Sequence, residues 1–83
     1  MKLTAMKNIG TEMKRKLNAV GVDSAEDLTW LGSKEAFLRL KTVYPKVCLV
    51  HLYTLQGAID NLDLGALPQD KKDELKAFSD SLR

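Results

Sequence analysis

The sequence has one cysteine and one histidine among its 83 residues. A single cysteine excludes an internal disulfide framework and is typical of a chain kept in a reducing compartment. Structural and catalytic zinc sites take three or four protein ligands, usually including cysteine or histidine. One cysteine and one histidine are too few to form such a site. Glycine loops of the P-loop or dinucleotide-binding type are also missing. We therefore expect no metal and no cofactor.

Long apolar runs are missing as well. No stretch approaches the roughly 18 consecutive apolar residues that a membrane-spanning helix needs. The first residues, Met1 to Lys7, are too short and too soon charged to form a signal peptide. The sequence therefore predicts a cytoplasmic chain with no membrane partner.

The composition that remains is that of an ordinary globular protein, with 45% hydrophobic and 29% charged residues. Its length suits one domain over residues 1–83. No segment shows sustained alternation of apolar and polar residues, whereas apolar residues repeat at helical spacing. The sequence predicts an all-α fold, with five short helices in a single compact domain.

Turn and capping residues set the boundaries of these helices. Thr11, Ser24 and Ser33 stand where N-caps are expected, and Gly21 and Gly32 stand where helices end. After a helical lead-in over residues 1–7, the expected helices cover residues 12–20, 25–31, 34–44, 47–61 and 68–82.

The helix expected over residues 47–61 is the most apolar and is predicted to be the centre of the core. Its main stripe has spacings of four and three residues and consists of Cys48, Leu52, Leu55, Ile59 and Leu62. Gly57 inside this helix costs about 1 kcal/mol in helix propensity. The glycine therefore indicates a close helix crossing, where a side chain would not fit.

One pair of residues could support nucleophilic catalysis. Cys48 and His51 lie three positions apart on one expected helix, so a thiol and its base could meet. Cys48 falls on the apolar stripe, however, and no orienting acid or oxyanion hole is evident nearby. The acids Asp60 and Asp63 precede a loop, without an apolar pocket that would raise a pKa. We expect a buried structural cysteine and a chain with no catalytic residues.

The stretch Asn8-Ile9-Gly10 lies between two amphipathic segments and is the most suggestive turn in the chain. Asparagine and glycine both tolerate left-handed backbone angles, so a sharp turn costs little free energy here. Such a turn can fix the angle between two helices. It can also expose N–H groups to a phosphate at a helix start.

The nucleic-acid hypothesis for this turn depends on the basic side chains around it. Its candidate residues are Lys7, Asn8, Ile9, Gly10, Thr11, Lys14 and Arg15. Only one glycine marks the turn, and a cluster of acids follows at residues 23–27. The joint between helices is therefore the favoured interpretation, and direct phosphate contact stays open.

Trp30 is the candidate for protein contact. It lies one residue off the stripe formed by Leu28 and Leu31. Tryptophan is enriched at the energetic centres of protein interfaces. The alternative is that Trp30 covers one edge of a small core.

The order of several short motifs resembles the C-terminal domain of the TfoX/Sxy regulators of natural competence, which also occurs as a free-standing small protein. The motifs are Asn8-Ile9-Gly10, Leu17, Gly21-Val22, Leu28, Leu31-Gly32, Ala36-Phe37, Leu40-Lys41, Leu52-Tyr53, Leu55, Gly57-Ala58-Ile59 and Leu67-Pro68. The chain departs from the family at Lys7 and Thr11, where proline is frequent, and at Leu64, where tryptophan is frequent.

The resemblance implies a small, cytoplasmic, bacterial all-α domain, similar to helix-hairpin-helix or SAM-like folds and without catalytic residues. In the full regulators this domain accompanies a separate N-terminal domain and takes part in switching on DNA-uptake genes. We expect this chain to lack that N-terminal domain and to be a regulatory or adaptor module that acts through contacts with a protein partner. The alternative is a weak, non-specific DNA-binding helix-hairpin-helix domain.

Overall fold

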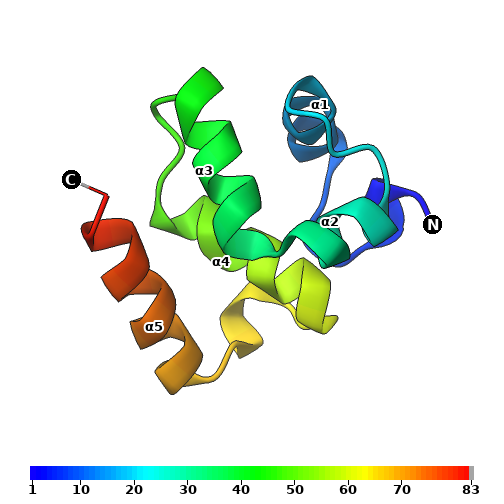
Figure 1. Ribbon diagram of the computed structural model, residues 1–83. Coiled ribbons are helices and arrows are strands. Elements are labelled where there is room, and N and C mark those ends of the chain that lie inside the picture. Colours follow the sequence, from blue (N-terminus) through cyan, green and yellow to red (C-terminus); the bar gives the residue numbers. More distant parts are fainter. Residues whose placement is uncertain (83) are drawn as a thin grey trace.

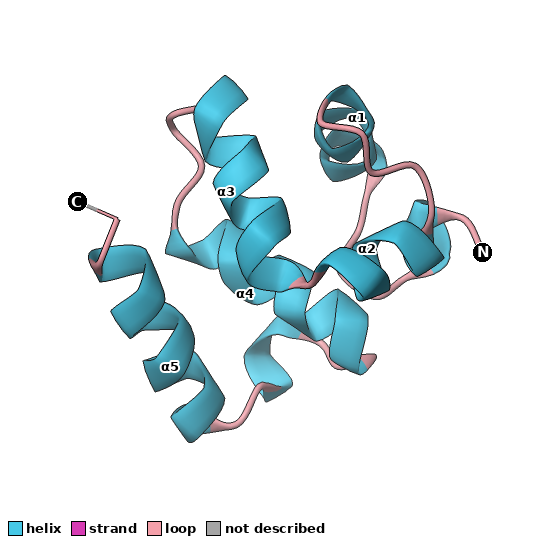
Figure 2. Cartoon of the chain, in the orientation of Figure 1, coloured by secondary structure: helices cyan, strands magenta, loops and turns pink. Residues whose placement is uncertain are grey.

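The computed structural model describes residues 1–82, and its regular elements are all helical (Figure 1). Five α-helices follow one another along the chain: α1 (Thr11–Ala19), α2 (Ala25–Leu31), α3 (Ser33–Val43), α4 (Leu49–Asp60) and α5 (Gln69–Asp80). Two short 3-10 turns, η1 (Leu3–Ala5) and η2 (Leu64–Ala66), precede α1 and α5. The predicted all-α fold of five short helices is confirmed, and the described residues contain no strand (Figure 2).

Helix α4 lies at the centre of the domain. It packs against α2, α3, α5 and η2, while α1 contacts α3 and η1 (Figure 1). The Cα radius of gyration is 11.6 Å, and the principal extents are 29 × 26 × 20 Å. The central position predicted for this helix is therefore confirmed.

All five helices contribute to one core. Its fully buried side chains include Leu17, Leu28, Phe37, Leu40, Leu52, Leu55 and Leu75. Each such side chain contributes about 1.5–3 kcal/mol relative to an exposed position. Along α4 only Val50, at 55%, and the terminal Asp60 are exposed, and the other residues of the helix are buried or half-buried.

Two of the predicted helix ends have the expected geometry. After α1, Gly21 has φ +85°, and the Val22 N–H donates to the Leu17 carbonyl at 2.9 Å. This is the Schellman arrangement, in which glycine avoids the strain of a left-handed residue. At the start of α2, the Ser24 hydroxyl accepts from the Asp27 N–H at 3.1 Å, which confirms that N-cap.

Two other predicted N-caps are wrong by one residue. Gly10 and Gly32 are the N-caps of α1 and α3, so Thr11 and Ser33 are the first helical residues. Gly32 ends α2 with φ +88° and also begins α3, which leaves Ser33 for another role. Its buried hydroxyl donates to the Gln56 side-chain oxygen at 2.6 Å and links α3 to α4.

The start of α4 differs more from the prediction. The helix begins at Leu49, and Cys48 is its exposed N-cap with extended backbone angles. The prediction of a buried structural cysteine is therefore wrong. Val47 takes the buried position, and the Lys41 ammonium donates to its carbonyl at 3.0 Å.

The last helix also stops earlier than its pattern suggested. Helix α5 ends at Asp80, and Leu82, which the predicted helix included, lies beyond that end and is 36% exposed. Within residues 1–82, none of the helices is long and apolar enough to cross a membrane.

Candidate interaction surfaces

Asn8 joins the opening turn to the loop that follows α4. Its backbone has φ +69°, in the left-handed region. The Asn8 Nδ2 group donates to the Leu62 carbonyl at 2.9 Å, and its Oδ1 accepts from the Leu64 N–H at 3.1 Å. One side chain thus satisfies two backbone groups of a distant segment.

Gly57 provides the space for this contact. A Cβ atom at Gly57 would lie 2.6 Å from Asn8 Nδ2 and 2.8 Å from the Leu62 carbonyl oxygen. The close approach predicted at this glycine is therefore present. The neighbour, however, is the Asn8 side chain and a loop carbonyl, whereas the sequence predicted a crossing helix.

The rest of the turn divides between core and surface. Ile9 is buried at 5% exposure, whereas Gly10 and Thr11 are exposed. Gly10 caps α1 without any side-chain hydrogen bond. Because Asn8 and Ile9 are both engaged in the fold, the turn serves as a joint between segments. Its exposed remainder is the part that a phosphate could reach.

The basic side chains proposed for nucleic-acid contact differ in their surroundings. Lys7 lies 3.9 Å from the Asp63 carboxylate, and Arg15 donates to the Glu12 carboxylate at 2.6 Å. Lys14 is exposed and takes part in none of the ion pairs found among the described residues. Nucleic-acid contact at these residues stays a prediction.

Trp30 is 87% exposed, so the interpretation that it covers an edge of the core is wrong. It stands between two hollows of about 710 and 180 Å³. The larger one, the Trp30 groove, is lined mainly by apolar side chains. These are Met1, Ala5, Met6, Ala25, Trp30, Ala58 and Ile59, together with the polar Glu26, Thr29 and Asn61.

One charged pair borders the Trp30 groove. The amino group of Met1 donates to the two carboxylate oxygens of Glu26 at 2.7 and 3.0 Å. This hydrogen bonding lowers the pKa of Glu26 below its ordinary value. Both partners are exposed, so an accessible pair of opposite charges lies beside a mainly apolar surface.

Cys48 and His51 do meet, as their spacing allowed, but in a capping role. The His51 Nδ1 atom accepts from the Cys48 backbone N–H at 3.0 Å, and the Cys48 Sγ lies 3.6 Å from the same nitrogen. The lone pair of Nδ1 is therefore engaged by the backbone and is poorly placed to take the thiol proton. The described residues hold no group of three His, Cys, Asp or Glu side chains that could bind a metal ion.

A further hollow of about 490 Å³ was not predicted from the sequence. This Tyr44 groove lies where the chain passes from α3 to α4, and it is lined by Lys16, Val43, Tyr44, Pro45, Lys46, Val47 and His51. The absence of acidic residues between Ala36 and Ile59 indicates the basic character of this region but not the hollow itself.

The fold and these surfaces define a small all-α domain with apolar hollows on its surface. The sequence matches the TfoX C-terminal domain family over residues 1–79, and the chain belongs to that family.

Related proteins support this assignment. Protein Sxy of Escherichia coli K12 is 32% identical over 81 residues, which are 98% of this chain and 39% of that protein. The chain thus spans about two fifths of the length of Sxy. Two crystal structures of uncharacterized Listeria monocytogenes protein, in triclinic and tetragonal forms, are each 38% identical and cover 99% of this chain. Their TM-scores are 0.96 and 0.95, with 93% and 100% of those chains covered.

Proposed function

We propose that this domain is a non-enzymatic regulatory or adaptor module that binds a protein partner through the Trp30 groove. The observation that carries the proposal is the 87% exposure of Trp30 beside an apolar hollow. A tryptophan so exposed gains little from folding, whereas its burial in an interface would remove a large apolar surface from water.

The energetic scale suits such a role. Covering an exposed tryptophan removes about 150–250 Å² from water. At about 25 cal/mol per Å², this is worth roughly 4–6 kcal/mol before the costs of association. Those costs consume much of the gain, so a partner must also contact the groove beside the indole, where Met1 is 67% exposed.

Affinity capture tests this proposal. The domain is immobilised and exposed to an extract of cells that express it natively, in parallel with Trp30→Ala and Val50→Ala. Val50 is the matched control because it is also an exposed apolar residue, at 55%, and lies outside the Trp30 groove. We expect a defined protein to be retained by the original chain and by Val50→Ala but lost from Trp30→Ala. Equal retention by all three would contradict the proposal.

Weak, non-specific DNA binding is the second proposal. It is supported by the exposed Gly10 cap, which leaves the N-terminus of α1 without a side-chain acceptor, and by the exposed Lys14 beside it. Phosphate contacts make affinity fall steeply with salt, so anisotropy titrations of duplex and single-stranded DNA should begin near about 50 mM salt.

The two proposals separate cleanly in that titration. DNA binding through this face should weaken strongly in a Lys14→Glu, Arg15→Glu double variant and should be unchanged in Trp30→Ala. If neither form of DNA binds at low salt, the second proposal fails and the first is unaffected.

A role in the control of DNA-uptake genes is the biological setting that we propose for this module. It is supported by membership of the TfoX C-terminal domain family and by the similarity to Sxy. A deletion strain would test it, through transcript levels of those genes in the native host. Transcript levels unchanged on deletion would contradict this setting and leave the contact proposal standing.

A further inference from the structure

Acidic residues are missing from two segments of the chain. None lies between Met13 and Val22 or between Ala36 and Ile59. The basic residues of these segments are Lys14, Arg15, Lys16, Arg39, Lys41 and Lys46. The first segment contains most of α1 and the second contains most of α3 and most of α4, and α1 packs against α3 while α3 packs against α4 (Figure 1). Arg15 is paired with Glu12 of its own helix, but Lys16 and Lys46 take part in none of the ion pairs found among the described residues.

The Tyr44 groove opens within this region. Val43 at its edge is 52% exposed, and no acidic residue lines it. The Lys16 ammonium lies 5.5 Å from the centre of the Tyr44 ring. This arrangement combines apolar surface with a rim of one charge sign.

The chain between α3 and α4 is held in place around this groove. The Lys41 ammonium donates to the carbonyls of Pro45 at 3.4 Å and Val47 at 3.0 Å. The Val47 N–H donates in turn to the Tyr44 carbonyl at 3.0 Å. A surface fixed in this way loses little conformational freedom when a ligand binds, which favours affinity.

We propose that the Tyr44 groove docks a protein segment in which an aliphatic or aromatic side chain is flanked by Asp or Glu. The apolar lining of the groove suits the anchor, and Lys16 and Lys46 complement the flanking carboxylates. A phosphate backbone could contact the same lysines but has no apolar group to pack against Val43 and Pro45. The lining therefore favours a peptide over nucleic acid. The Trp30 groove shares no lining residue with this one.

Fluorescence anisotropy with short labelled probes tests the proposal. The probe peptide carries one Phe between Asp and Glu residues. Comparison probes replace the Phe by Ser, replace the acids by Lys, or use a duplex oligonucleotide in place of peptide. We expect saturable binding of the first peptide, and affinity at least about tenfold lower for each of the others.

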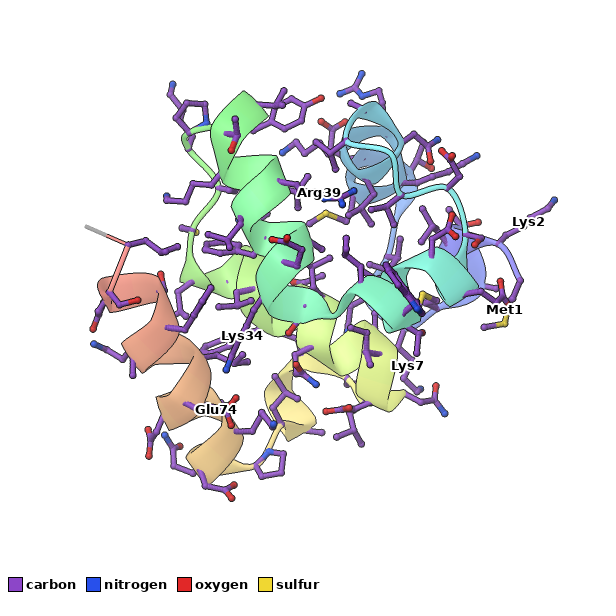
Figure 3. All side chains as sticks on the ribbon, in the orientation of Figure 1. Met1, Lys2, Lys7, Lys34, Arg39 and Glu74 are labelled. Carbon is purple, nitrogen blue, oxygen red and sulfur yellow. The ribbon has the colours of Figure 1, made fainter. Side chains whose placement is uncertain are left out.

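Two matched pairs of variants locate the binding. Lys46→Glu should weaken the first peptide by roughly fivefold or more, whereas Lys2→Glu, which changes net charge equally, should not. Lys2 extends away from the body of the domain in Figure 3. Val43→Ser should weaken the peptide, whereas Val50→Ser, at a comparably exposed valine outside the groove, should not.

Amide chemical shifts of the original chain provide a test that requires no variant to fold. Peptide addition should shift the signals of Val43, Lys46 and His51 and leave the Trp30 indole signal unchanged. The proposal is overturned if the Ser-containing peptide or the oligonucleotide binds as tightly as the Phe peptide, if no peptide binds, or if the shifts lie around Trp30. Trp30→Ala should bind this peptide normally, so failure here is distinguishable from failure of the Trp30 groove.

Discussion

At the scale of single residues, Asn8 connects parts of the chain that are far apart in sequence. Its hydrogen bonds to Leu62 and Leu64 span 54 and 56 positions. The left-handed backbone of Asn8 and the missing side chain at Gly57 are both needed for the amide to reach that loop. A turn that resembled a phosphate cradle in the sequence is therefore held mainly by structural contacts.

Replacing Asn8 separates its two contributions. Asn8→Gly keeps a left-handed backbone but removes both hydrogen bonds, and it should cost about 1–3 kcal/mol of unfolding free energy. Asn8→Ala should cost about 1–2 kcal/mol more, because a Cβ atom is strained at positive φ. Urea denaturation followed by circular dichroism measures both values. If the two variants were equally stable, backbone strain would play no part at this position.

Adding a methyl group at Gly57 tests the close contact directly. Gly57→Ala should destabilise the domain by roughly 1–3 kcal/mol through overpacking, despite the better helix propensity of alanine. Gly65→Ala is the control because a Cβ atom added there would have no neighbour within 4 Å. The control should change stability by less than about 0.5 kcal/mol in the same urea titration. Equal effects at the two glycines would show that Gly57 is not crowded.

Glu74 offers a prediction about ionisation. Its carboxylate accepts from the Lys34 ammonium at 2.8 Å, with Lys71 at 3.4 Å, and the Lys34 hydrogen bond is the main cause of its lowered pKa (Figure 3). Carbon-detected NMR should place the pKa of Glu74 below its ordinary value of 4.5.

The lowered pKa of Glu74 determines how the stability of the fold changes with pH. A carboxyl group whose pKa is lower in the folded state stabilises the fold above its unfolded pKa, and this contribution is lost as the pH falls through the folded pKa. Lys34→Ala should raise the pKa of Glu74 toward 4.5. The Lys34→Ala substitution should reduce the stability of the fold slightly at neutral pH and should have no such effect in strong acid. An unchanged Glu74 pKa in Lys34→Ala would contradict the assignment.

At the scale of helices, caps decide where each element begins. Apolar periodicity located all five helices, because the stripes that form the core recur at helical spacing. The predicted helix starts were wrong by one residue where glycine precedes serine or threonine. At Gly32-Ser33 the glycine takes the cap and Ser33 turns inward to Gln56, a tertiary contact that no local pattern contains.

Cys48 was misplaced for a related reason. Its spacing fits the apolar stripe of α4, but the chain leaves Pro45 in a turn and enters the helix only at Leu49. A cysteine that follows the 4–3 pattern cannot be distinguished by sequence from one that sits at the N-cap. The exposed thiol and its contact with His51 are consequences of that cap.

This position yields a stability prediction. Cys48→Ser places a hydroxyl at the N-cap, which accepts more strongly from the third helical N–H than a thiol does. The variant should be stabilised by about 0.5 kcal/mol, and Cys48→Ala should be destabilised by up to about 1 kcal/mol. Thermal unfolding of the reduced proteins measures both. A serine variant less stable than alanine would show that the thiol does more than cap the helix.

At the scale of the whole molecule, the two largest hollows described above have different surroundings. The Trp30 groove borders Glu26, whereas the Tyr44 groove is lined by two lysines and a histidine and by no acid. Trp30 could be singled out from the sequence by its residue type and its position off the apolar stripe. The exposure of Trp30 could not be predicted from the sequence, because its position next to the Leu28 and Leu31 stripe fits a residue at the edge of the core equally well. The Tyr44 groove depends on how the α3–α4 link packs beside α1, which sequence spacing does not reveal.

Photocrosslinking from position 30 tests the central claim most directly. A benzophenone amino acid replaces Trp30 in one sample and Val50 in another, and both are irradiated in extract of the native host before mass spectrometry. The account predicts a discrete protein adduct from position 30 that unlabelled domain competes away, and no such adduct from position 50. Adducts to nucleic acid alone, or no specific adduct from position 30, would contradict it.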